Sequence, residues 1–93
     1  MRIEFTPSAR QQFLSAIRYI RSDKPAAAAA FKRKAERDLS RLVDYPESGH
    51  PVPEFPDSGY RQLIVKPYRF FYQVRGEIIW IGGVWHGAQL PDS

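Results

Sequence analysis

The sequence has no cysteine and no long apolar run, and both absences narrow the class of protein. Without cysteine the chain forms no disulfide and no thiolate metal site, which fits a reducing compartment. A membrane-spanning helix needs roughly 18 or more consecutive apolar residues, and no stretch approaches that length. The opening MRIEFTPSAR also lacks the apolar region of a secretion signal. We therefore expect a soluble cytoplasmic protein that makes no contact with a membrane.

The composition is that of a small, basic, globular protein. Of 93 residues, 43% are hydrophobic and 14% aromatic, so we expect one domain spanning residues 1–93. The formal net charge of +4 favours an acidic partner, either a nucleic acid or an acidic protein segment. A charge of this size can equally serve solubility alone. Residues 18–41 hold eight of the fourteen lysines and arginines, which is typical of a solvated surface or a docking face for an acidic helix.

The first half of the chain predicts a short strand followed by two helices. RIEFT alternates in polarity, as a strand does. Thr6 can then cap a first helix, and Pro7 suits its first turn. The buried stripe of this helix is expected at Phe13, Ala16, Ile17 and Ile20. A second helix, antiparallel to the first, is expected from about Pro25 to Val43.

The second half predicts a long loop and three strands. Residues 44–59 hold four prolines and two glycines, and a loop of this length is often functional or mobile. Strands are expected at 60–65, 68–74 and 78–86, separated by short turns, with a loosely held tail at 87–93. The resulting class is α+β with the order β-α-α-β-β-β: a helix hairpin on one face of a mostly antiparallel four-stranded sheet.

Alternation along the three strands divides their side chains between two faces. With two-residue turns, the face expected to meet the helices carries Leu63, Val65, Tyr68, Phe70, Tyr72, Ile79 and Ile81. The second face would carry Gln62, Ile64, Arg69, Phe71, Gln73, Trp80, Val84 and His86, with Trp85 on the opposite side from Trp80. A bulge at Gly82-Gly83 would exchange part of this assignment. The second face is expected to be wet, aromatic and basic, with Arg69 and His86 together.

An ordered set of residues in the last third of the chain resembles a known superfamily. Arg61 precedes a short apolar strand, and the set continues with Tyr68-Arg69, Tyr72, Val74, Gly76, Val84 and His86-Gly87. Together with the helix pair and the Pro/Gly-rich loop, this pattern resembles the RelE/ParE superfamily of toxins from bacterial type II toxin–antitoxin modules. The resemblance covers nearly the whole chain. The long helix hairpin and the ending VWHGAQLP are similar to the ParE-like branch.

Resemblance to the ParE-like branch implies a toxin that inhibits DNA gyrase by binding and so arrests growth, as in plasmid stabilization. No catalytic group, cofactor or small-molecule substrate would then be needed. The residues expected to bind the target are Arg61, Arg69, Trp80 and His86. The expected partner is an acidic, partly disordered antitoxin that folds on the toxin, either as a helix in a groove or as a strand added to a sheet edge.

Resemblance to the RelE-like branch implies a ribosome-dependent endonuclease that cleaves mRNA. Glu54 would be the general base, Arg69 would hold the phosphate, and His86 would be the general acid. Members equipped in this way carry a tyrosine after the histidine, where this chain has Gly87. A third possibility is a superfamily member with a lost or different activity, such as a generic binding module.

Each candidate residue also has a purely structural interpretation. His86 can be a hydrogen-bonded residue at a strand end, Arg69 can pair with an acid, and Trp80 can pack. Arg61 falls on the helix-facing side, so we expect it at a sheet edge with its guanidinium in water. His50 is expected to be exposed. The two histidines lie 36 residues apart in a chain without cysteine, so no metal site is expected.

Overall fold

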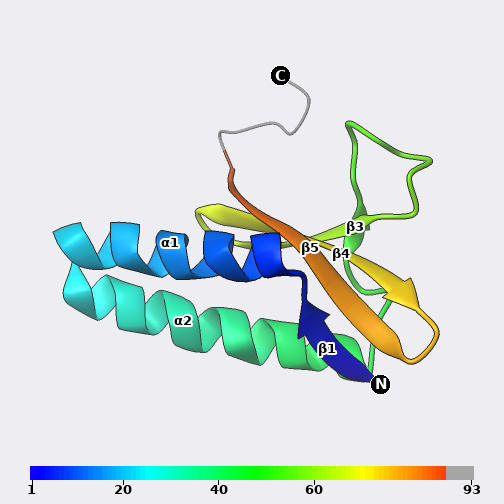
Figure 1. The fold of residues 1–93 in the computed structure, drawn as a ribbon, viewed down its shortest axis with the longest axis horizontal. Coiled ribbons are helices and arrows are strands. Elements are labelled where there is room, and N and C mark those ends of the chain that lie inside the picture. The colour runs from blue at the N-terminus through cyan, green and yellow to red at the C-terminus, as the bar shows by residue number, and fades with distance from the viewer. Residues whose placement is uncertain (88–93) are drawn as a thin grey trace.

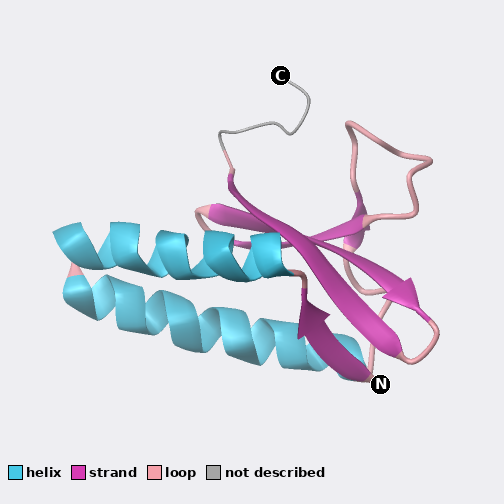
Figure 2. Cartoon of the chain, viewed as in Figure 1, coloured by secondary structure: helices cyan, strands magenta, loops and turns pink. Residues whose placement is uncertain are grey.

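The computed structural model describes residues 1–87 and has the predicted α+β architecture. The elements are β1 (Arg2–Phe5), α1 (Pro7–Asp23), α2 (Pro25–Ser40), a 3-10 turn η1 (Arg41–Val43), β2 (His50–Pro51), β3 (Arg61–Val65), β4 (Tyr68–Arg75) and β5 (Ile78–His86). The helices form an antiparallel pair beside the twisted sheet, and the long loop before β3 projects away from them (Figures 1 and 2). The tail predicted at 87–93 lies, apart from Gly87, outside the described residues.

The sheet has five strands in the order β1-β5-β4-β3-β2, so the prediction of four strands is wrong. The additional strand, β2, comes from the segment expected to be loop, where His50 pairs with Gln62 and Pro51 with Arg61. β1 pairs in parallel with β5, whereas the other neighbours are antiparallel. The two-residue turn between β4 and β5 begins at Gly76, whose φ of +59° suits glycine.

Local sequence signals define the ends of both helices. The side chain of Thr6 accepts a hydrogen bond from the amide of Ala9 at 3.1 Å, and Pro7 lies in the first turn. α1 ends at Asp23, and Pro25 opens α2 after the single extended residue Lys24. The second helix ends at Ser40, three residues before the predicted end, and the 3-10 turn η1 continues it to Val43.

The core lies between the helix pair and one face of the sheet. Phe13 of α1 and Phe31 of α2 meet Phe70 of β4, with ring centroids 5.5 and 6.3 Å apart. The strand side chains with no exposed area in this layer are Val65, Phe70, Tyr72, Ile79 and Ile81. All five were predicted to face the helices. In the part of the chain that the structure describes, no helix is long and apolar enough to cross a membrane.

Candidate functional site

A β-bulge at Gly82 determines which side chains of β5 face the helices. Phe71 pairs with Gly83, but the next residue of β4 pairs with Ile81, so Gly82 is the extra residue. Beyond the bulge the alternation is shifted by one, because successive side chains point to opposite faces. Val84 therefore turns into the core, where it is only 4% exposed. The bulge lies at the glycine pair where the sequence allowed one.

The bulge overturns part of the predicted second face. Val84 and His86 lie on the helix side, and Trp85 lies opposite Arg69 on the same side as Trp80. The predictions that His86 accompanies Arg69 and that Trp85 opposes Trp80 are therefore wrong. We call the side of the sheet away from the helices the open face. It carries Gln62, Ile64, Arg69, Phe71, Gln73, Trp80 and Trp85.

Arg69 is the most heavily bonded side chain of the open face. Its Nε donates to Gln62 at 2.7 Å, and its Nη1 and Nη2 donate to the two carboxylate oxygens of Glu54 at 3.1 and 2.8 Å. The guanidinium also lies over the ring of Phe71, 4.9 Å from its centroid. Hydrogen bonds from Arg69 hold the pKa of Glu54 below its usual value. The carboxylate is thus the acid with which Arg69 pairs.

The Glu54–Arg69 contact fastens the long loop onto the sheet. Val52, two residues before Glu54, is only 2% exposed, and the loop leaves Gln62 and Arg69 with 6% and 8% of their surface exposed. The open face is therefore not wet at this point, contrary to the prediction. The physical reason is that the loop folds back over the sheet and supplies a partly exposed counter-ion to the buried guanidinium.

The beginning of the same loop is held by Arg61 and Tyr72. Arg61 Nη1 donates to the carbonyl oxygens of Gly49 at 2.8 Å and Glu47 at 3.3 Å. The hydroxyl of Tyr72 donates to the carbonyl of Pro46 at 2.8 Å and accepts from the amide of Gly49 at 2.9 Å. Burial raises the pKa of Tyr72. The prediction that Arg61 lies at a sheet edge with its guanidinium in water is wrong: the residue pairs with β2 on one side and β4 on the other, and its guanidinium is bonded to the loop.

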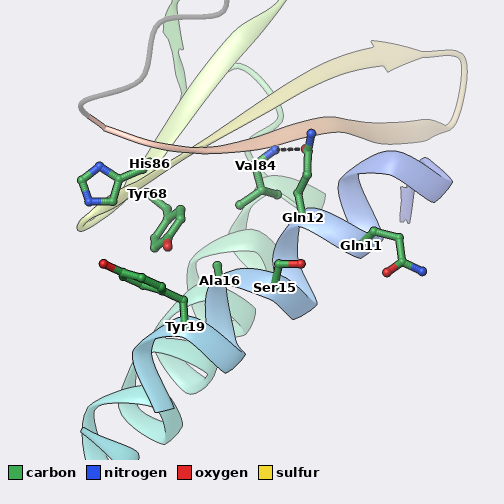
Figure 3. A pocket seen from close by; sticks show the side chains of 8 residues that line it. All are labelled: Gln11, Gln12, Ser15, Ala16, Tyr19, Tyr68, Val84 and His86. Atoms are coloured by element: carbon green, nitrogen blue, oxygen red, sulfur yellow. Dashed lines mark hydrogen bonds between the residues drawn. The ribbon is translucent and has the colours of Figure 1, made fainter. Parts of the chain in front are cut away.

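His86 lies in a groove on the helix side of the sheet. Its ring makes an edge contact with Tyr68, 5.4 Å between centroids. The groove has a volume of about 730 Å³, and Tyr19 of α1 faces Tyr68 and His86 across it (Figure 3). At its inner end the side-chain oxygen of Gln12 accepts a hydrogen bond from the amide of Val84 at 2.8 Å. The hydrogen bond to the amide of Val84 in β5 therefore comes from a side chain of α1 and not from a neighbouring strand.

The geometry separates the three residues proposed for mRNA cleavage. Glu54 and Arg69 are paired on the open face, whereas His86 points into the groove on the other side of the sheet. All three guanidinium nitrogens of Arg69 already donate to protein acceptors. The arrangement offers no single point at which the carboxylate, the guanidinium and the imidazole converge on one phosphate.

Trp80 and several residues that the sequence did not single out line two hollows on the open face. Trp80 is partly exposed and lines one of them with Arg75, while Tyr60 lies between the two. Trp85 walls the other hollow. The one sequence signal for this site was the pair Gly82-Gly83, because a bulge there places Trp85 on the open face. His50 is exposed, as predicted. Among the described residues, no group of three or more His, Asp or Glu is placed to hold a metal ion.

Comparison with known proteins identifies the family. Residues 3–91 match the family model described as ParE toxin of type II toxin-antitoxin system, parDE. A solved structure described as the chromosomal ParDE TA system from P. aeruginosa has the same fold, with a TM-score of 0.76 at 19% identity over 92% of this chain and 95% of that one. No curated protein matches the sequence. The chain therefore belongs to the ParE toxin family of type II toxin–antitoxin systems.

Proposed function

We propose that this ParE-family toxin inhibits DNA gyrase by binding to it, without catalysis, and so arrests growth. The observation that carries the proposal is the position of Arg69 and His86 on opposite faces of the sheet. Cleavage of RNA by its own 2′-hydroxyl needs a base, a cation and an acid around one phosphate. Membership of the ParE family favours a binding activity over the RelE-like alternative.

The residues expected to touch the target differ in how they would act. Trp80 is partly exposed on the open face and is available for direct contact. Arg61 and Arg69 are bonded to the long loop, so they would act by holding that loop in the shape that meets the target. His86 lies in the groove beside α1, on the other side of the sheet, so we do not expect it to touch the target. In this proposal Trp80 is a contact residue, and the two arginines are positioning residues.

An antitoxin is the expected second partner, and we propose that an acidic one occupies the groove beside α1. Exposed apolar surface lines this groove, since Tyr19 is 71% exposed. Arg18 lies at its rim, where it bonds the hydroxyl of Ser15 at 3.3 Å. A segment with an apolar face and acidic side chains complements both features.

The test of the proposed function is a gyrase cleavage assay. The purified chain would be mixed with bacterial gyrase, supercoiled plasmid and ATP, quenched with detergent and protease, and analysed for linear DNA. We expect linear DNA that disappears when the antitoxin is added. Absence of linear DNA, while a quinolone control produces it, would reject gyrase as the target.

Two variants separate binding from catalysis. Arg69→Ala and His86→Ala would be compared in gyrase cleavage and in mRNA cleavage on programmed ribosomes. If the chain is a gyrase inhibitor, it cleaves no ribosome-bound mRNA, and His86→Ala retains poisoning of gyrase unless it disturbs the fold. Ribosome-dependent cleavage that both substitutions abolish would establish the RelE-like alternative.

A further inference from the structure

Two hollows on the open face meet at Tyr60 and Gly82. The first has a volume of about 250 Å³ and is walled by the rings of Phe55, Tyr60, Phe71 and Trp85. The second, of about 350 Å³, also has Tyr60 on its wall and includes Arg75 and Trp80. An apolar hollow and a cationic hollow therefore lie side by side, and neither belongs to the groove beside α1.

The bulge residues Gly82 and Gly83 leave room for the rings of Tyr60 and Trp85 that wall the first hollow. A β-carbon on Gly82 would stand 3.3 Å from the ring and hydroxyl of Tyr60. A β-carbon on Gly83 would stand 2.8 Å from the indole nitrogen of Trp85, closer than such contacts allow. Both aromatic side chains thus rest directly on glycine backbone, and any larger residue would displace them. The apolar hollow is consequently a specific product of this pair of glycines.

Three polar groups around the hollows are not used within the described part of the chain. Neither the indole N–H of Trp85 nor the hydroxyl of Tyr60 makes a hydrogen bond to a described residue. Arg75 is exposed, its guanidinium bonds only the side chain of Gln73, at 3.0 Å, and it makes no ion pair among residues 1–87. Arg69 on the same strand is, by contrast, fully engaged with Glu54 and Gln62.

We propose that this pair of hollows, Tyr60 at its centre, binds a segment of the toxin's target protein that presents one large apolar side chain beside a carboxylate. The apolar hollow has room for a single side chain, and the free donors of Tyr60 and Trp85 suit backbone carbonyls next to it. The guanidinium of Arg75, which makes no ion pair among the described residues, can bind one carboxylate of the target segment. The inference deepens the proposed function and rests on it, because it names the face by which the target is held.

The occupant is the target and not the antitoxin, because the two surfaces lie on opposite sides of the sheet. The groove proposed for the antitoxin is formed by α1 and the helix-facing side chains of β4 and β5. The hollows lie on the open face, and the loop that Glu54 fastens walls the first of them. A nucleotide fits less well. Thr6, the N-cap of α1, also lines the second hollow, but its side chain already accepts the amide of Ala9, and the described lining includes no glycine-rich phosphate loop.

The chemistry can be tested on the full chain by NMR titration. The probes are acetyl-Phe-Glu-amide, acetyl-Phe-Gln-amide and acetyl-Ala-Glu-amide, observed at the indole N–H signals of Trp80 and Trp85. We expect acetyl-Phe-Glu-amide to shift both signals and to bind about threefold to fivefold tighter than the glutamine peptide, the upper part of the range for an exposed ion pair. Arg75→Gln should abolish that preference, whereas the matched variant Arg33→Gln, an exposed arginine on α2, should preserve it.

Three results would overturn the inference. The first is that no indole signal shifts, and the second is that the alanine peptide binds as well as the phenylalanine peptides. The third is that adenosine monophosphate shifts the same signals more strongly than any peptide. In the gyrase assay, Tyr60→Ala and Arg75→Gln should require several times more toxin to yield linear DNA. Wild-type yields from both variants would reject the inference and leave the proposed function standing, whereas no linear DNA from the wild-type chain would reject the proposed function.

Discussion

The two sides of the β-sheet are closed by different physical means. On the helix side, Phe70, Ile79 and Ile81 have no exposed area and are covered by the helices α1 and α2. On the open face, Arg69 and Gln62 are nearly as deeply buried, but a proline-rich loop covers them through an ion pair and hydrogen bonds. One side is sealed by apolar area and the other by a few directional contacts.

This difference predicts how each side responds to change. Apolar burial is non-directional and shared among many contacts, so its loss weakens the whole fold. A polar closure depends on every donor and acceptor, so the loss of one partner releases the segment it holds. Such a segment can open while the rest of the molecule stays folded. We therefore expect global effects from substitutions on the helix side and local effects from those on the loop.

The largest effect is expected from Phe70→Ala. Phe70 is fully buried between Phe13 and Phe31, so its truncation removes apolar contact and leaves a cavity costing about 3–5 kcal/mol of unfolding free energy. Denaturant unfolding followed by circular dichroism measures this loss. Phe55→Ala is the matched control on the loop, where the ring is 37% exposed, and should cost about 1 kcal/mol or less. Equal losses from the two variants would contradict the distinction between the sides.

A smaller effect is expected from Tyr72→Phe, which tests the link between the two sides. The ring stays in the core, but the amide of Gly49 and the carbonyl of Pro46 lose their shared partner. A buried polar group left without a partner costs about 1–3 kcal/mol. The loss should be accompanied by faster amide exchange at the start of the loop.

The control for this substitution is Tyr68→Phe. Tyr68 is also buried and also faces the helices, but its hydroxyl makes no hydrogen bond to any described residue. We expect a change within about 0.5 kcal/mol for this variant. A loss as large as that of Tyr72→Phe would mean that the hydroxyl bonds to the loop do not stabilise the fold.

The helices, the long strands and the core were predictable from sequence because each depends on neighbouring residues. Thr6 and Pro7 start a helix by local bonding, and the alternation at Phe70 and Tyr72 places both rings in the core. The two-residue strand β2 was not predictable, because its proline-rich sequence becomes a strand only by pairing with β3. The strand propensity of a segment does not indicate whether it pairs with another segment far away in the chain.

The candidate site was predictable only in part, because it depends on register and on a loop. A single extra residue at Gly82 moved His86 to the helix side and Trp85 to the open face. The sequence allowed a bulge at the glycine pair but gave no means to tell whether it forms. The pairing of Glu54 with Arg69 joins residues 15 apart through an irregular loop, and no periodicity predicts such a contact.

The smallest effect is expected from acidification, and it concerns the loop alone. The folded pKa of Glu54 is below its unfolded value because of the hydrogen bonds from Arg69. The pair therefore stabilises the closed loop fully above the unfolded pKa of about 4.3, and the stabilisation is lost as the pH falls through the folded pKa. We expect the loop to open under acidic conditions while α1 and α2 remain folded.

The measurement is amide exchange in residues 50–56 together with tryptophan fluorescence, recorded as the pH is lowered. Glu54→Gln cannot lose a charge, so its loop should open equally at every pH and the acid-dependent step should disappear. Glu36→Gln removes an exposed carboxylate that pairs with Lys32 on α2, at 3.2 Å, and should retain the step. If the step survived in Glu54→Gln, another titrating group would cause it, and the Glu54–Arg69 ion pair would not be what closes the loop. The contrast between the two sides of the sheet would then be one of degree and not of kind.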